Sequence, residues 1–133
     1  MASRARLRQR LDRLLDEHRR LFEVAFDRTP LWRGIVHEAK RRCGKPLCRC
    51  ARGELHVSTV FSDRSGPKQR NLALKGRVLK RFRTMTEAYR TLRRNRARAV
   101  AVQREILEIF DVLERARREE AAAHYAGELE RRP

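Results

Sequence analysis

The chain has 133 residues, of which 34 are Lys or Arg and 17 are Asp or Glu, so its formal charge at pH 7 is +17. Its hydrophobic fraction is 41%, but aromatic residues make up only 6%, which disfavours a large globular core and favours an elongated or metal-assisted fold. There is no run of 18 apolar residues and no secretory signal after the basic start, so we expect a cytoplasmic protein without a membrane partner.

The first predicted element is an amphipathic helix over residues 4–27, within a first segment 1–29. Five apolar residues and one histidine recur there at alternating spacings of four and three residues, which places them on one helix face. They are Leu7, Leu11, Leu14, His18, Leu21 and Ala25. Thr29-Pro30 ends the helix, because the residue before proline disfavours helical torsions.

A small antiparallel β region is predicted for the second segment, residues 30–75. A strand is expected at 35–39 and another at 55–61, where Val57, Thr59 and Phe61 share one face. A returning strand at 69–74 follows a turn at 63–67. Trp32 precedes the first strand, and we expect it to pack between sheet and helix rather than to stack on bases.

The third segment, residues 76–133, is predicted to contain one long helix over 76–126. Its four–three seam consists of Val78, Phe82, Met85, Tyr89, Leu92, Arg96, Ala99, Gln103, Ile106, Phe110 and Leu113. A capping-box pattern at 84–87 allows a break near Thr84. Because the first helix can cover only about half of the long one, we expect a homodimer or a helical partner protein. The predicted fold class is mainly α, with a small zinc-bound β region and a coiled-coil-like pairing of the long helix.

All three cysteines lie within eight residues, and a histidine follows. The spacing of Cys43, Cys48, Cys50 and His56 is C-x4-C-x-C-x5-H, and three thiolates with one imidazole suit a tetrahedral Zn²⁺ site. His37 is the competing fourth ligand. A disulfide with one odd thiol, a reactive thiol loop and an iron–sulfur cluster remain alternatives. Four ready ligands favour a closed structural site, so no catalytic residue is predicted.

One set of residues resembles a bacterial family described only as a domain of unknown function. The residues are Gly34, Cys43-Gly44-Lys45-Pro46, Cys48-Arg49-Cys50-Ala51, Gly53 and His56, similar to a CGKPxCxCAxGxxHGP pattern. The resemblance covers about residues 31–113, where Tyr89-Arg90 and Leu92-Arg93-Arg94 are similar to the family's long helix. It implies a preceding strand, an aromatic strand after the histidine, and a nucleic-acid context near mobile elements. Val57-Ser58 departs from the family's Gly-Pro, and Phe61 alone remains of the expected aromatics.

The excess positive charge is concentrated in the middle of the chain. Residues 28–98 hold 21 Lys or Arg and 4 acidic residues, whereas the preceding and following segments carry net charges of +2 and −2. Such a high density of positive charge in one segment indicates that the segment binds a polyanion. The predicted phosphate contacts are Lys40, Arg41, Arg42, Lys45, Arg49, Arg52, Lys68, Arg70, Lys80, Arg83, Arg90, Arg94 and Arg98.

The sequence is therefore compatible with three functions. The first is a zinc-stabilised nucleic-acid-binding protein, with DNA ahead of RNA, acting as an accessory factor of a mobile element. The second is a non-catalytic helical adaptor in a larger protein or ribonucleoprotein assembly. The third, an enzyme with a zinc-activated water, is the weakest, and neither a small-molecule substrate nor catalysis is expected.

Overall fold

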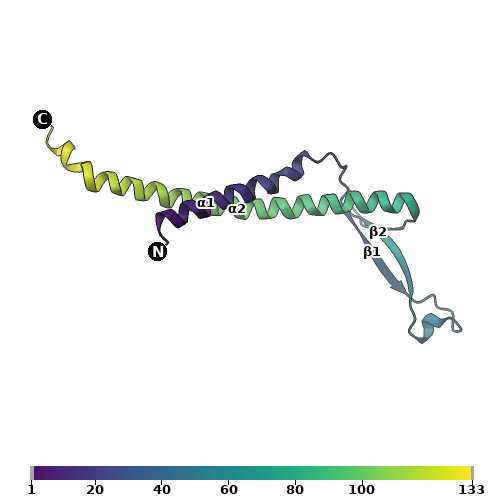
Figure 1. Cartoon of the computed structure of the whole chain (residues 1–133). Coiled ribbons are helices and arrows are strands. Elements are labelled where there is room, and N and C mark those ends of the chain that lie inside the picture. The colour runs from purple at the N-terminus through teal and green to yellow at the C-terminus, as the bar shows by residue number, and fades with distance from the viewer. Residues whose placement is uncertain (1, 133) are drawn as a thin grey trace. The chain divides into compact units, whose positions relative to one another are not determined.

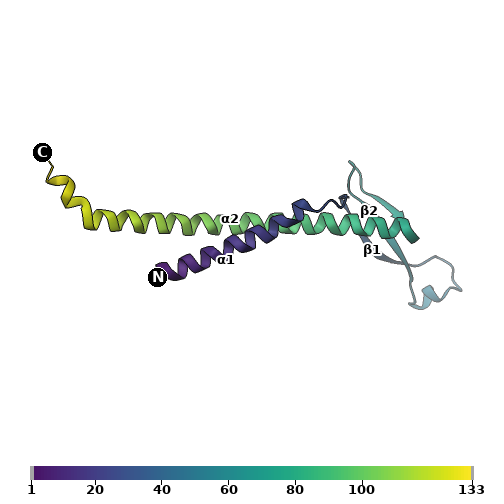
Figure 2. The same cartoon turned by 45° about the horizontal axis from the view of Figure 1, so that its top comes forward.

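The structure, a computed structural model, describes residues 2–132 and consists of two α-helices and a three-stranded sheet (Figures 1 and 2). The elements in chain order are α1 (Arg4–Phe22), the 3-10 helix η1 (Glu23–Phe26), β1 (Gly34–Arg41), the 3-10 helix η2 (Arg49–Arg52), β2 (His56–Asp63), β3 (Arg70–Ala73) and α2 (Gly76–Glu130). The sheet is antiparallel with the strand order β1-β2-β3. The predicted fold class, an N-terminal helix, a small β region and a long C-terminal helix, is confirmed.

The chain divides into two compact units, and the division falls inside α2. The helical unit contains residues 2–26 and 94–132, and the sheet unit contains residues 27–93. These units group the elements differently from the three sequence segments 1–29, 30–75 and 76–133. No helix among residues 2–132 is long and apolar enough to cross a membrane.

In the helical unit, α1 packs antiparallel on the C-terminal part of α2. Arg4 pairs with Glu120 and Glu17 with Arg98, which fixes the opposite directions of the two helices. Leu14 of α1 is fully buried against Val102 and Ile109, and the predicted stripe residues Leu7, Leu11 and Leu21 pack around it. Ser3 caps the start of the helix, because its Oγ accepts a hydrogen bond from the N–H of Arg6 at 3.3 Å.

The seam on α2 agrees with the prediction at Ala99, Ile106 and Leu113 but differs at other positions. The predicted seam residues Val78 and Arg96 are exposed. After Ala99 the buried positions are Val102 and Ile109, whereas Gln103 is exposed and Phe110 is 59% exposed. After Ala99 the next residue on the same helix face can be Val102, three residues on, or Gln103, four residues on. Leu14 packs on Val102 because an apolar side chain favours an apolar partner. Gln103 lies at the margin of the seam.

In the sheet unit, the core forms where the end of the β1–β2 pair meets the start of α2. Phe61 of β2 is 1% exposed, and its ring lies 4.7 Å from that of Phe82. Trp32 meets the Phe82 ring edge-on at 5.3 Å, and its backbone N–H donates to the carbonyl of Met85 at 3.3 Å. The expected packing role of Trp32 is confirmed.

Asp63 closes the predicted turn at 63–67. Its carboxylate is buried and accepts hydrogen bonds from the hydroxyl of Ser65 at 2.6 Å, the N–H of Ser65 at 2.9 Å, Arg70 at 2.7 Å and the indole N–H of Trp32 at 3.0 Å. These donors, Ser65 foremost, hold the pKa of Asp63 far below its usual range. A single carboxylate thus ties together the turn, β3 and the segment before β1.

The helix boundaries differ from the prediction in three details. α1 ends at Phe22 and continues as η1, where one helix to residue 27 was expected. α2 runs without a break through Thr84, whose hydroxyl donates to the carbonyl of Lys80 at 3.1 Å within the helix. The capping-box pattern therefore does not interrupt α2, which ends at Glu130 rather than 126.

Candidate metal centre

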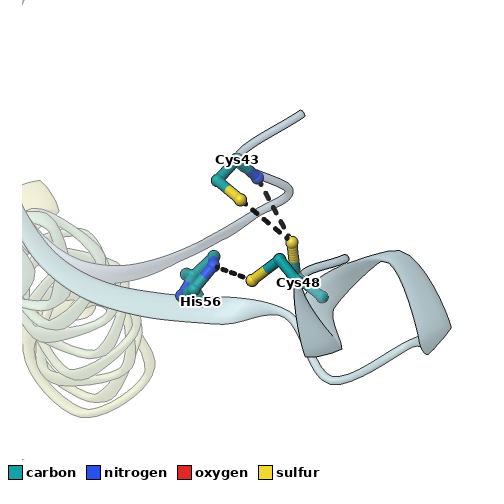
Figure 3. A group of neighbouring side chains, drawn as sticks. Cys43, Cys48 and His56 are labelled. Atoms are coloured by element: carbon teal, nitrogen blue, oxygen red, sulfur yellow. Dashed lines mark hydrogen bonds between the residues drawn. The ribbon is translucent and has the colours of Figure 1, made fainter. Parts of the chain in front are cut away.

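Four sulfur and nitrogen donors converge in the loop that joins β1 to β2 (Figure 3). Cys43 follows β1, Cys48 and Cys50 lie at the start of η2, and His56 is the first residue of β2. One ligand atom from each of the four lies within 4.8 Å of all the others. The structure thus brings together the four residues that the spacing predicted.

Two of the donor–donor distances are close to those of a tetrahedral zinc site. The sulfurs of Cys43 and Cys50 are 3.5 Å apart, and the sulfur of Cys48 lies 3.2 Å from Nε2 of His56. Zn–S bonds of about 2.3 Å and Zn–N bonds of about 2.0 Å place neighbouring donors roughly 3.5 to 3.8 Å apart. An ion of this size is accommodated if the closest donors move outward by a few tenths of an ångström.

Backbone N–H groups of the loop donate hydrogen bonds to the cysteine sulfurs. The N–H of Cys43 points to the sulfur of Cys50 at 3.4 Å, and that of Lys45 lowers the pKa of Cys43. The N–H of Cys50 likewise lowers the pKa of Cys48. At Cys50 itself the N–H of Cys43 acts in the same direction, but burial and the two neighbouring thiols outweigh it and raise the pKa. The pKa is thus lowered at two of the thiols and raised at the third, and a cation among them would favour the ionised form of all three.

Two glycines allow the loop to close. Gly44 has φ +83° between the first two cysteines, and Gly53 has φ +107° at the end of η2. The N–H of Gly53 donates to the carbonyls of Arg49 and Cys50, so the chain reverses there and returns His56 to the cluster.

His56, not His37, completes the cluster. In the β1–β2 register His56 lies opposite Arg41, directly beside the loop. His37 lies opposite Val60, four residues farther along the sheet, and is exposed. The alternative assignment of His37 as the fourth ligand is therefore wrong in this structure.

The predicted phosphate-contacting residues divide between the two units. Six surround the metal loop, are all exposed, and have no carboxylate within 4.0 Å among the described residues: Lys40, Arg41, Arg42, Lys45, Arg49 and Arg52. Lys68 follows the turn, and Lys80, Arg83 and Arg90 lie exposed on the first part of α2. Arg94 and Arg98 belong to the helical unit.

Two of these cations have partners within the chain, which the sequence did not indicate. Arg98 makes a two-pronged pair with Glu17 at 2.6 and 3.1 Å, and Arg70 pairs with buried Asp63 at 2.7 Å. In both arginines the positive charge is therefore matched by a carboxylate of the same chain. The predicted contacts on α2 also divide between the units, with Lys80, Arg83 and Arg90 in the sheet unit and Arg94 and Arg98 in the helical unit.

No family model matches the chain, and no curated protein or solved structure matches it either. The resemblance to a domain of unknown function therefore rests on the Cys/His motif, and the structure supports that motif by bringing its four donors together.

Proposed function

We propose that the Cys43, Cys48, Cys50 and His56 cluster binds Zn²⁺ as a structural site. Support comes from the soft donor set, its tetrahedral spacing and the backbone N–H groups directed at the sulfurs. Cys50 is the only buried residue between Arg42 and Leu55, so the loop has almost no apolar core of its own. Metal binding would supply the folding free energy that such a core supplies elsewhere.

We also propose that the sheet unit binds nucleic acid through phosphate contacts, and that it does so without catalysis. The observation that carries this proposal is the absence of partners for its cations. Residues 27–93 contain 18 Lys or Arg, 13 of them Arg, against 5 acidic residues. Only Arg70 among these cations has a carboxylate within 4.0 Å in the part of the chain that the structure describes.

The helical unit provides the contrast. Its described residues hold 16 Lys or Arg and 12 acidic residues, and four of the arginines are paired with glutamates. These pairs are Arg4–Glu120, Arg10–Glu105, Arg98–Glu17 and Arg118–Glu114. Unpaired cations of one sign repel each other unless a polyanion neutralises them. Arginine suits this role because its guanidinium grips phosphate oxygens in a two-pronged way.

DNA is the first candidate ligand, and two matched double variants test the proposal. Lys45→Glu with Arg49→Glu reverses two charges in the metal loop, whereas Arg115→Glu with Arg117→Glu reverses two exposed, unpaired charges of the helical unit. We expect the loop variant to weaken duplex DNA binding by at least about tenfold and to lower the salt slope by about two, because two phosphate contacts are lost.

We expect the helical-unit variant to change the affinity by less than about threefold, since it alters the net charge equally but not the binding surface. Equal losses of DNA affinity in the two variants would show that only the net charge of the chain matters, which would contradict the proposal. Zinc content is measured in both proteins, so that a loss of the metal is recognised.

A second candidate, a helical adaptor that pairs with another copy of the chain, is favoured by one observation. Val100, Leu107 and Phe110 are exposed on α2 at spacings of seven and three residues, which places them on one stripe away from Leu14. Sedimentation equilibrium tests it: we expect a dimer that Leu107→Glu converts to a monomer. A wild-type monomer at every concentration would contradict this candidate.

A further inference from the structure

The tip of the metal loop exposes one large apolar side chain among cations. Leu47 is 94% exposed, more than any other large apolar residue among those described. Lys45 and Arg49 lie two residues before and after it, and both are exposed. An isolated exposed leucine needs no explanation on most surfaces, but this one lies in a loop flanked by six exposed cations.

The loop holds Leu47 in a fixed turn. The N–H of Cys48 donates to the carbonyl of Lys45 at 3.2 Å, which closes a turn whose two central residues are Pro46 and Leu47. The proline ring fixes φ at the first central position. Cys48, directly after Leu47, belongs to the Cys/His cluster, so a bound metal would anchor the turn at its base. Because the turn already holds Leu47 in place, little conformational entropy is lost when its side chain inserts into a ligand.

We propose that Leu47 is a wedge that inserts between stacked base pairs of duplex DNA while the cations around it hold the adjacent phosphates. This rests on the proposed nucleic-acid binding and names its ligand as a duplex that can be unstacked. Apolar side chains such as leucine serve as wedges in proteins that kink DNA. Flexible pyrimidine–purine steps unstack at the lowest cost.

The composition of the loop favours DNA over an anionic membrane. Peripheral insertion into lipid depends on an apolar face of several residues together with basic groups. Here Leu47 is the only large apolar side chain at the turn, and the residues on either side of Pro46-Leu47 are Lys45 and Cys48. A single leucine is enough for a wedge, because phosphate contacts supply most of the affinity.

The test uses the zinc-loaded chain of 133 residues with two near-isosteric variants. Leu47→Asn removes the apolar tip, and Val57→Thr makes the same kind of change at another exposed apolar residue of the sheet unit, on β2. The probe is a duplex of about 25 base pairs whose central TpA steps carry 2-aminopurine in place of adenine. Fluorescence of 2-aminopurine rises when the base unstacks, and anisotropy of the same duplex reports the affinity.

We expect the wild-type protein and Val57→Thr to raise the 2-aminopurine fluorescence by similar factors. Leu47→Asn should abolish most of that rise and weaken binding by roughly ten- to a hundredfold, the range expected when one leucine is no longer buried. Its salt slope should stay within one of the wild-type value, because no phosphate contact is removed.

The outcomes separate the wedge from the proposed function. Salt-dependent binding without a fluorescence rise, or with a rise that Leu47→Asn leaves intact, overturns the wedge and keeps nucleic-acid binding. No binding by any of the three proteins overturns both. Leu47-dependent binding to vesicles of phosphatidylcholine and phosphatidylserine, with no Leu47 effect on DNA, overturns the wedge in favour of a membrane site.

Discussion

Gly34, at the start of β1, is the position where one added methyl group should cost the sheet unit most. A Cβ built there would lie 2.6 Å from the carbonyl oxygen of Ser62 and 2.8 Å from Cε2 of the buried Phe61 ring. Neither neighbour can move freely, because Ser62 belongs to the β1–β2 ladder and Phe61 packs on Phe82. Overpacking of a close-packed site costs about 1 to 3 kcal/mol. Because the added methyl group meets two fixed atoms, we expect Gly34→Ala to lower the free energy of unfolding by about 3 kcal/mol.

Gly66→Ala is the matched control. A Cβ at Gly66 meets no atom within 4 Å, so this change should be neutral or should raise the free energy of unfolding by up to about 1 kcal/mol. The assay is urea unfolding followed by the fluorescence of Trp32, the single tryptophan, which packs on Phe82 inside the sheet unit. With a slope of about 1 to 2 kcal/mol/M, we expect Gly34→Ala to lower the urea midpoint by about 1.5 to 3 M. Midpoints that agree for the two variants would refute the packing of β1 on Phe61.

Three further changes probe the metal, the buried carboxylate and the helical core. Wild-type protein should retain about one zinc per chain after dialysis and Cys48→Ser clearly less; equal zinc contents by mass spectrometry would count against the site. The depressed pKa of Asp63 stabilises the fold above the unfolded-state pKa of about 3.9, and this contribution disappears as the pH falls below that value. The gap in urea midpoint between wild type and Asp63→Asn should therefore narrow below about pH 4, whereas a constant gap would show that the carboxylate charge is irrelevant. Leu14→Ala should lower the free energy of unfolding by about 3 to 5 kcal/mol. Leu15 is next to it but half-exposed, so Leu15→Ala should lower the free energy of unfolding by less than about 1 kcal/mol. Equal losses in thermal melts followed by circular dichroism would contradict the helical core.

Local patterns in the sequence were enough to predict the elements and the metal donors. The spacing of Leu7, Leu11 and Leu14 predicted the buried face of α1, and that face is confirmed. The Cys/His spacing predicted a cluster because a short loop cannot separate its ends, and the β1–β2 register then selected His56 over His37. In both cases the information lies within about a dozen neighbouring residues.

Features that depend on a distant partner could not be predicted in the same way. The step from Ala99 to Val102 rather than Gln103 is decided by Leu14, which lies more than 80 residues away. The sequence does not distinguish Arg98 from the other predicted phosphate contacts, but in the structure Arg98 pairs with Glu17. Charge patterning locates a basic segment, but only the packed structure shows which of its cations are already neutralised.

The salt dependence of duplex DNA binding tests most directly whether the unpaired cations of the sheet unit form a nucleic-acid-binding surface. The dissociation constant of the zinc-loaded wild-type chain is measured from about 50 to 200 mM salt, with log affinity plotted against log salt concentration. We expect a slope of about −4 to −6, as for a surface in which six or so cations contact phosphates, such as the six exposed around the metal loop. A slope between zero and about −1, or no binding at the lowest salt concentration, would contradict the central proposal.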